Sequence, residues 1–148
     1  MSLRLTRPQE AGSVTRKIGT MPFALYAHRD YAALDVPDRW QFITYDESFA
    51  DMPQQKWLRA IAARRPIACE LNSISGHLIA ARARAGIAGL PCFLGDGDPD
   101  LVRVGDGLTA FSREIWLLVH RDLRNTPSVR AVMDFAVAVV SRREGLSD

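Results

Sequence analysis

The sequence predicts an α/β domain with a mostly parallel sheet flanked by helices. Short apolar runs alternate with amphipathic segments along the chain, as in a βαβα succession. The run 115–119 is almost continuously apolar, which is typical of a strand covered on both faces. The chain has 148 residues, of which 47% are hydrophobic and 24% charged, so it can bury a core and is neither disordered nor fibrous.

The predicted strands are short runs of aliphatic, aromatic and β-branched residues that end at proline, glycine or polar clusters. They cover residues 3–5, 23–27, 40–45, 67–71, 86–90, 101–104 and 115–119. After the second of these strands, residues 30–34 are predicted to form a short helix.

Three longer helices are predicted from their end signals and apolar stripes. The first begins at Pro53, which suits a first helical position, and ends before Pro66. Residues 72–76 supply capping side chains for the second helix. Thr126 and Pro127 form the cap and first position of the last helix.

Charge and cysteine content exclude several classes of protein. The net charge of +2 comes from 19 basic and 17 acidic residues. The basic residues are not clustered, so the sequence does not indicate a nucleic-acid-binding surface. Cys69 and Cys92 lie in apolar runs and form no CxxC motif, so they are expected to be buried free thiols. The first twenty residues lack the apolar core of a signal peptide and no run approaches a membrane span, so a cytoplasmic protein without membrane contact is expected.

A metal site is not expected. Asp96, Asp98 and Asp100 have the alternate spacing of the first half of a calcium loop. That loop would need glycine and glutamate where the chain has Leu101 and Gly107. A solvated turn is the better interpretation.

No cofactor is expected either. Residues 105–107 begin a Gly-x-Gly dinucleotide fingerprint, but Ala110 stands where the third glycine would be. Neither lysine follows a glycine at the spacing of a phosphate-binding loop.

The chain is not expected to be an enzyme. The nearest nucleophile is Ser73 or Ser75 beside His77, but the G-x-S-x-G pattern around a nucleophilic serine is missing. Two alternatives remain open: a small α/β hydrolase-like enzyme that uses Ser75, His77 or Asp46 in acid–base roles, and a solute-binding lobe. The absence of a signal peptide argues against the second.

Asn72, Ser73 and Ser75 follow a predicted strand and open a predicted helix. Free backbone N–H groups, small hydroxyls and the positive end of the helix dipole together suit a carboxylate or another anion. Capping of the helix by one serine is the simpler interpretation, and both roles are compatible.

Five stretches in order resemble the carboxyl-terminal half of the effector domain of LysR-type transcriptional regulators. They read LRLTRP, IGTMPFALYA, AGIAGLPCFL, EIWLLVHRDLR and PSVRA, at residues 3–8, 18–27, 85–94, 114–124 and 127–131. Tyr31 also stands where the family has a tyrosine. Two positions depart from the family pattern, because Arg84 replaces a glycine and Gly89 replaces a larger apolar residue.

The resemblance implies a periplasmic-binding-protein-like type II fold, with Rossmann-like lobes and a small inducer between them. It implies that residues 1–16 are a crossover from a truncated first subdomain, 17–107 the second effector-binding subdomain, and 108–148 the returning strand and helix of the first. No residue corresponds to the family's winged helix-turn-helix, so DNA binding is expected only through an absent amino-terminal domain.

The resemblance further implies an effector-sensing fragment of a bacterial regulator. Its partners would be a small-molecule effector, such as a carboxylate, and a second copy of the chain. Self-association is expected because strand 115–119 and the last helix present apolar faces to the missing lobe. The effector contacts would come from two strand-to-helix loops, through Tyr45, Asp46, Ser48, Asn72, Ser73 and Ser75. Gly86 and Ile87 would lie behind these loops.

Overall fold

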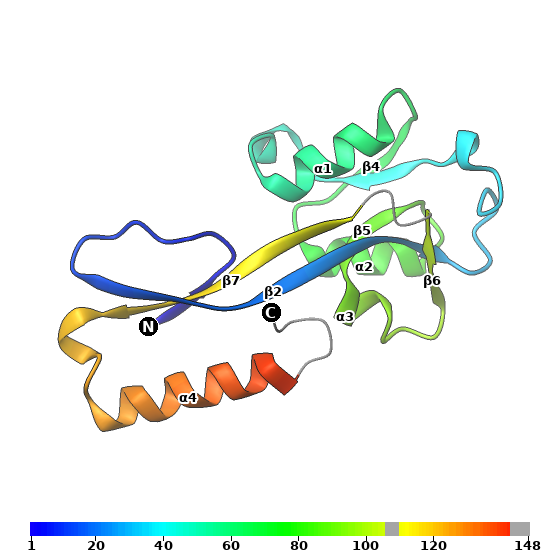
Figure 1. Ribbon diagram of the computed structural model, residues 1–148. Coiled ribbons are helices and arrows are strands. Elements are labelled where there is room, and N and C mark those ends of the chain that lie inside the picture. The colour runs from blue at the N-terminus through cyan, green and yellow to red at the C-terminus, as the bar shows by residue number, and fades with distance from the viewer. Residues whose placement is uncertain (106–109, 143–148) are drawn as a thin grey trace. The chain divides into compact units, whose positions relative to one another are not determined.

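The computed structural model describes residues 1–105 and 110–142. The chain divides into two compact units, in which unit 1 comprises Met1–Pro22 with Ser112–Asp148 and unit 2 comprises Phe23–Phe111. The long strand β2 (Ser13–His28) contributes residues to both units (Figure 1). Within the described residues, no helix is long and apolar enough to cross a membrane.

Unit 2 has a parallel pair of strands at its centre. In this pair, β3 (Phe42–Thr44) lies beside β4 (Ile67–Glu70), and an isolated parallel bridge joins Phe42 to Ile87. The other elements of the unit follow the chain order: η1 (Pro37–Arg39), η2 (Glu47–Phe49), α1 (Pro53–Ala62), α2 (Ile74–Arg82), β5 (Ala88–Pro91), α3 (Cys92–Gly95) and β6 (Leu101–Val104).

The core of unit 2 lies on both faces of β3. Successive side chains of a strand point to opposite faces. Phe42 accordingly packs in one apolar cluster with Leu58 of α1, and Ile43 packs in the other with Ala81 of α2. Helices α1 and α2 therefore contact β3 from its two faces, and β3 leads directly into the loop that begins at Tyr45.

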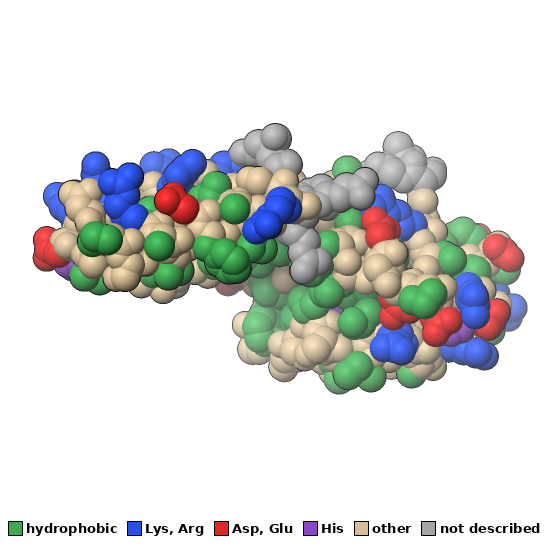
Figure 2. Space-filling model, turned by 90° about the horizontal axis from the view of Figure 1, so that it is seen from below, with side chains coloured by type: hydrophobic (Ala, Val, Ile, Leu, Met, Phe, Trp, Pro, Cys, Tyr) green, Lys and Arg blue, Asp and Glu red, His purple; other side chains and the backbone are tan. Residues whose placement is uncertain are grey.

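Unit 1 contains β1 (Ser2–Arg4), most of β7 (Phe111–His120), η3 (Arg121–Leu123) and α4 (Pro127–Arg142). β1 pairs with β7 in an antiparallel register that sets Ser2 opposite Leu118. Among the described residues of α4 only Val140 is buried, whereas Val132 and Phe135 are 47% and 66% exposed. The apolar face of α4 is therefore largely open to solvent (Figure 2).

The predicted helix starts are confirmed at Pro53 for α1 and Pro127 for α4. The first helix ends earlier than predicted, at Ala62, because Ala63 takes a positive φ of 51° that no helix tolerates. The short helix predicted for residues 30–34 is wrong. That segment forms turns, with hydrogen bonds such as Leu34 N to Tyr31 O that span three residues.

The mixed α/β class is confirmed, but a mostly parallel sheet is not. β2 pairs antiparallel with both β5 and β6, and β1 with β7, while β3 and β4 are parallel. The order β1-β7-β2-β5, with β6 also on β2, joins strands that are far apart in sequence. Pairing of this kind depends on long-range packing and leaves no local signal in the chain.

The three aspartates of the rejected calcium pattern bind different partners. Asp96 accepts a hydrogen bond from the Tyr26 hydroxyl at 2.7 Å and pairs with Arg103. The ion pairs of the other two, both at 3.3 Å, are Asp98 with Arg82 and Asp100 with Arg29.

Both cysteines are free thiols. Cys92 is buried as predicted. Cys69 is only half-buried, because every residue of β4 is at least partly exposed to solvent. Of the Gly-x-Gly pattern at 105–107, residues 106 and 107 lie outside the described residues.

Candidate functional site

The ends of β3 and β4 bring the two predicted effector loops together. Leu71 N donates to Thr44 O at 2.9 Å, which continues the strand pairing to the start of both loops. Asp46 N then donates to Asn72 Oδ1 at 3.1 Å, and Asn72 Nδ2 donates to Asp46 Oδ2 at 2.6 Å. This two-way bond holds residues 45–48 against residues 72–75, which we call the candidate effector site.

The Asp46 carboxylate also caps the short helix η2. Its Oδ1 accepts from the backbone N–H of Ser48 at 2.9 Å and from the Ser48 hydroxyl. Hydrogen bonds from Asn72 first, and then from Ser48, lower the pKa of Asp46 below its ordinary value. The site therefore contains a fixed negative charge at neutral pH.

Ser73 is the N-cap of α2, as its sequence context predicts. Its Oγ accepts from Gly76 N at 3.0 Å and lies 3.3 Å from Ser75 Oγ. Both serines are exposed. A hydroxyl that accepts from the backbone still has its own proton, so this pair can donate to a bound oxygen atom.

Tyr45 is held by Gln55, a residue that the sequence does not single out. Gln55 Oε1 accepts from Tyr45 N at 3.0 Å, and Gln55 Nε2 donates to Tyr45 O at 2.8 Å. The Tyr45 side chain is only 3% exposed, and its ring centroid lies 4.2 Å from that of His77. Tyr45 therefore forms the floor of the candidate effector site and little of its surface.

His77 lies beneath the same site and is fully buried. Its Nε2 lies 2.6 Å from Leu71 O and donates to it, which fixes the tautomer. Burial lowers the pKa of His77, and this effect outweighs the opposing contributions of the Leu71 and Thr44 backbone groups. Because this nitrogen is hydrogen-bonded to a carbonyl, it is not placed to activate Ser75, and the hydrolase-like alternative gains no support.

The buried His77 makes stability depend on pH. Its pKa is lower in the folded chain than the ordinary 6.5, so the unfolded chain binds more protons once the pH falls below about 6.5. The free energy of unfolding should therefore decrease from pH 7.5 to pH 5, and His77→Gln should show a shallower decrease. Urea unfolding at several pH values measures both slopes. Equal slopes would contradict a buried neutral His77.

Gly86 and Ile87 lie behind the loops and pack against β3. A Cβ at Gly86 would lie 2.4 Å from Gln41 O, so only glycine is compatible with this backbone. Ile87 is fully buried, and its N–H donates to the same Gln41 O at 2.8 Å. Its carbonyl accepts from Ile43 N at 2.8 Å, so both residues support the strand that leads into the site.

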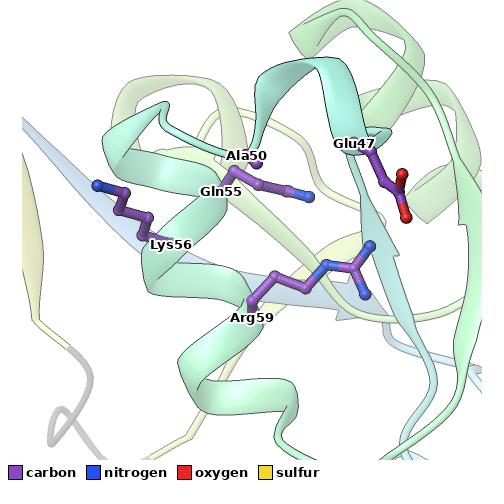
Figure 3. A pocket seen from close by; sticks show the side chains of 5 residues that line it. All are labelled: Glu47, Ala50, Gln55, Lys56 and Arg59. Atoms are coloured by element: carbon purple, nitrogen blue, oxygen red, sulfur yellow. The ribbon is translucent and has the colours of Figure 1, made fainter.

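A pocket of about 450 Å³ lies between η2 and α1. In Figure 3 the side chains of Glu47 and Arg59 point toward one another, and the amide end of Gln55 points toward the same space. Lys56 and Ala50 complete the lining. Gln55 lines this pocket and is also hydrogen-bonded to the backbone of Tyr45. The charged side chains that line the pocket are of both signs and are exposed to solvent.

Comparisons with known proteins agree on one family. The LysR substrate binding domain family matches residues 1–141. The C-terminal domains of a LysR family protein from Agrobacterium tumefaciens share 20% sequence identity at a TM-score of 0.69, covering 93% of this chain and 72% of that one. No curated protein matches the sequence.

Two further solved structures contain bound small molecules. Full-length LysG from Corynebacterium glutamicum with bound effector Arg has 16% identity and a TM-score of 0.69, and covers 99% of this chain. This chain spans 52% of LysG. The CcmR regulatory domain from Synechocystis in complex with 2-PG has 14% identity and a TM-score of 0.63, covering 95% of this chain and 73% of that one. The family match over nearly all of the sequence shows that this chain belongs to the LysR substrate binding domain family.

Proposed function

We propose that this chain is the effector-sensing part of a cytoplasmic LysR-type transcriptional regulator, and that it senses rather than catalyses. The observation that carries the proposal is the two-way Asp46–Asn72 bond, which joins two loops at the carboxyl ends of parallel strands. Ligands of open α/β sheets bind at such strand ends. DNA recognition by the regulator would belong to a winged helix-turn-helix outside these 148 residues.

The proposed division of the chain assigns residues 17–107 to the second effector-binding subdomain. Residues 1–16 would be the crossover from the first subdomain, and 108–148 its returning strand and helix. The effector of such a protein shifts it between states only if it binds the two states with different affinity.

We assign effector contact to the exposed residues of the candidate effector site. Ser73 and Ser75 would donate hydrogen bonds to a carboxylate, aided by the positive end of α2. Asp46 and Ser48 would face the opposite end of the effector, and the negative Asp46 favours a donor group there. Asn72 would hold the two loops together, with Tyr45, Gly86 and Ile87 as buried supports.

Replacing the two hydroxyls should weaken carboxylate binding. The probes are sodium acetate and L-arginine, the latter named as the effector of LysG. In a ¹⁵N NMR titration, the amides of residues 73–76 should shift on addition of either probe. Ser73→Ala with Ser75→Ala should lower the affinity by about tenfold, because two hydrogen bonds to a charged group are lost.

Matched variants separate binding from folding. Ser112→Ala with Ser141→Ala removes two exposed hydroxyls elsewhere and should leave the affinity unchanged. Ser73→Asp keeps a capping oxygen on α2 but places a negative charge against the carboxylate, so it should retain the thermal midpoint and lose binding. If Ser73→Asp bound the carboxylate probes with unchanged affinity, the two serines would not contact the effector.

The exposed face of α4 should cause self-association. Val132 and Phe135 are 47% and 66% exposed on one helix, and buried apolar area drives association. Sedimentation equilibrium should show dimers or larger species that Val132→Glu with Phe135→Glu shifts toward monomer. The control is Val36→Glu with Ile79→Glu, which changes two exposed apolar residues of unit 2 in the same way. A wild-type chain that stays monomeric at high concentration contradicts this prediction.

A further inference from the structure

Unit 1 contains a second candidate binding site, in which three arginines surround one small pocket. The pocket has a volume of about 210 Å³ and is lined by Arg16 of β2, Arg124 and Asn125 of the segment before α4, and Arg130, Met133 and Asp134 of α4. It belongs wholly to unit 1, whereas the candidate effector site lies in unit 2.

The guanidinium groups of these arginines have no partners among the residues that the structure describes. Within residues 1–105 and 110–142, the structure gives Arg16, Arg124 and Arg130 no ion pair and no side-chain hydrogen bond. Other arginines of the chain do have them, as in the Arg4–Glu10 pair at 2.7 Å. The three positive charges outnumber the single carboxylate at the pocket, that of Asp134, and a bound anion would offset the excess positive charge.

The net charge of unit 1 also favours the binding of an anion. Unit 1 has ten lysines and arginines against six aspartates and glutamates, whereas unit 2 has nine against eleven. Basic side chains gather over the part of unit 1 where α4 begins (Figure 2). Such a field concentrates anions near the pocket.

The donor set favours a phosphate group over a carboxylate. A guanidinium presents a planar fork of N–H donors that binds two oxygens of one phosphate, and several forks can share its three terminal oxygens. The Asn125 amide adds a neutral donor, and Met133 offers an apolar wall for a short carbon chain. Asp134 at the same pocket can accept from a hydroxyl of that chain. The pocket volume limits the ligand to a small phosphorylated molecule.

We propose that the pocket of Arg16, Arg124 and Arg130 binds the phosphate group of a small phosphomonoester. This site is separate from the candidate effector site and does not depend on the proposed function. Inorganic phosphate and a phosphomonoester share the chemistry that the pocket recognises.

The test is isothermal titration of the chain with sodium phosphate, glycerol 3-phosphate, sodium acetate and a short DNA duplex, at constant ionic strength. The wild type should bind the two phosphates, the monoester more tightly, and acetate weakly. Arg16→Gln, Arg124→Gln and Arg130→Gln combined should reduce phosphate affinity at least about tenfold. Arg124→Gln alone should give a smaller loss in the same direction if the combined variant does not fold.

A charge-matched variant serves as the control. Arg39→Gln, Arg64→Gln and Arg142→Gln remove three exposed guanidinium groups from other places and should leave phosphate affinity within twofold, a range of about 0.4 kcal/mol. An equal loss of phosphate affinity in this control would mean that net charge alone explains the effect, and would overturn the proposed site. Absent phosphate binding in the wild type, or arginine-dependent binding of DNA alone, would also overturn it.

Discussion

Phe42→Ala should lower the free energy of unfolding by about 3–5 kcal/mol, the usual cost of removing a buried phenyl ring. Phe42 is fully buried in β3, in one cluster with Leu58 and Ile87. Its ring meets that of Trp40 edge to face at 6.4 Å, and the Arg65 guanidinium lies 5.1 Å from its centroid. Alanine would leave a cavity between α1 and the strand. Urea unfolding followed by circular dichroism measures the loss.

The control is Ile79→Ala on α2, where the side chain is 66% exposed. Its effect should stay within about 0.5 kcal/mol, because a surface substitution removes little packing. If both variants lost the same stability, β3 would not be the centre of the unit 2 core. The candidate effector site starts directly after β3, so Phe42→Ala should also weaken carboxylate binding even where the chain stays folded.

The sequence predicts the starts of helices well because the signals are local. Proline at a first helical position and serine as a cap act through the backbone of the next few residues. Pro53, Ser73 and Pro127 therefore stand at or beside the observed starts of their helices. The end of α1 is less predictable, since the positive φ of Ala63 has no residue-type signal such as glycine.

Strand pairing is predicted less well because it depends on contacts far along the chain. The first half of β2 contains Arg16 and Lys17, so no apolar run marks it as a strand. It extends because β2 is hydrogen-bonded to other strands of its sheet, and such contacts leave no pattern in residues 13–22 themselves. The sequence does not predict the antiparallel partners of β2 for the same reason.

The candidate effector site was predictable in part. Asp46 and Asn72 follow two predicted strands, and parallel neighbours end at one edge, so their proximity follows from the sequence. The sequence does not assign Gln55 and His77 to this site, since their role depends on which face of a helix packs against β3. The three arginines of unit 1 come from segments more than a hundred residues apart, and only the fold brings them together.

Gly86→Ala should lower the free energy of unfolding by about 3 kcal/mol, near the upper end for overpacking. The added Cβ would lie 2.4 Å from the carbonyl oxygen of Gln41, a backbone atom that cannot rotate away. That oxygen also accepts from Ile87 N at 2.8 Å, so relief of the clash displaces the residue before β3. Gly12→Ala is the control, because a Cβ there meets nothing within 4 Å and only its φ of +77° costs about 1 kcal/mol. A Gly86→Ala loss no larger than the Gly12→Ala loss would mean that β3 tolerates displacement, and its loop could not then hold Asp46 against Asn72 as a fixed part of the site.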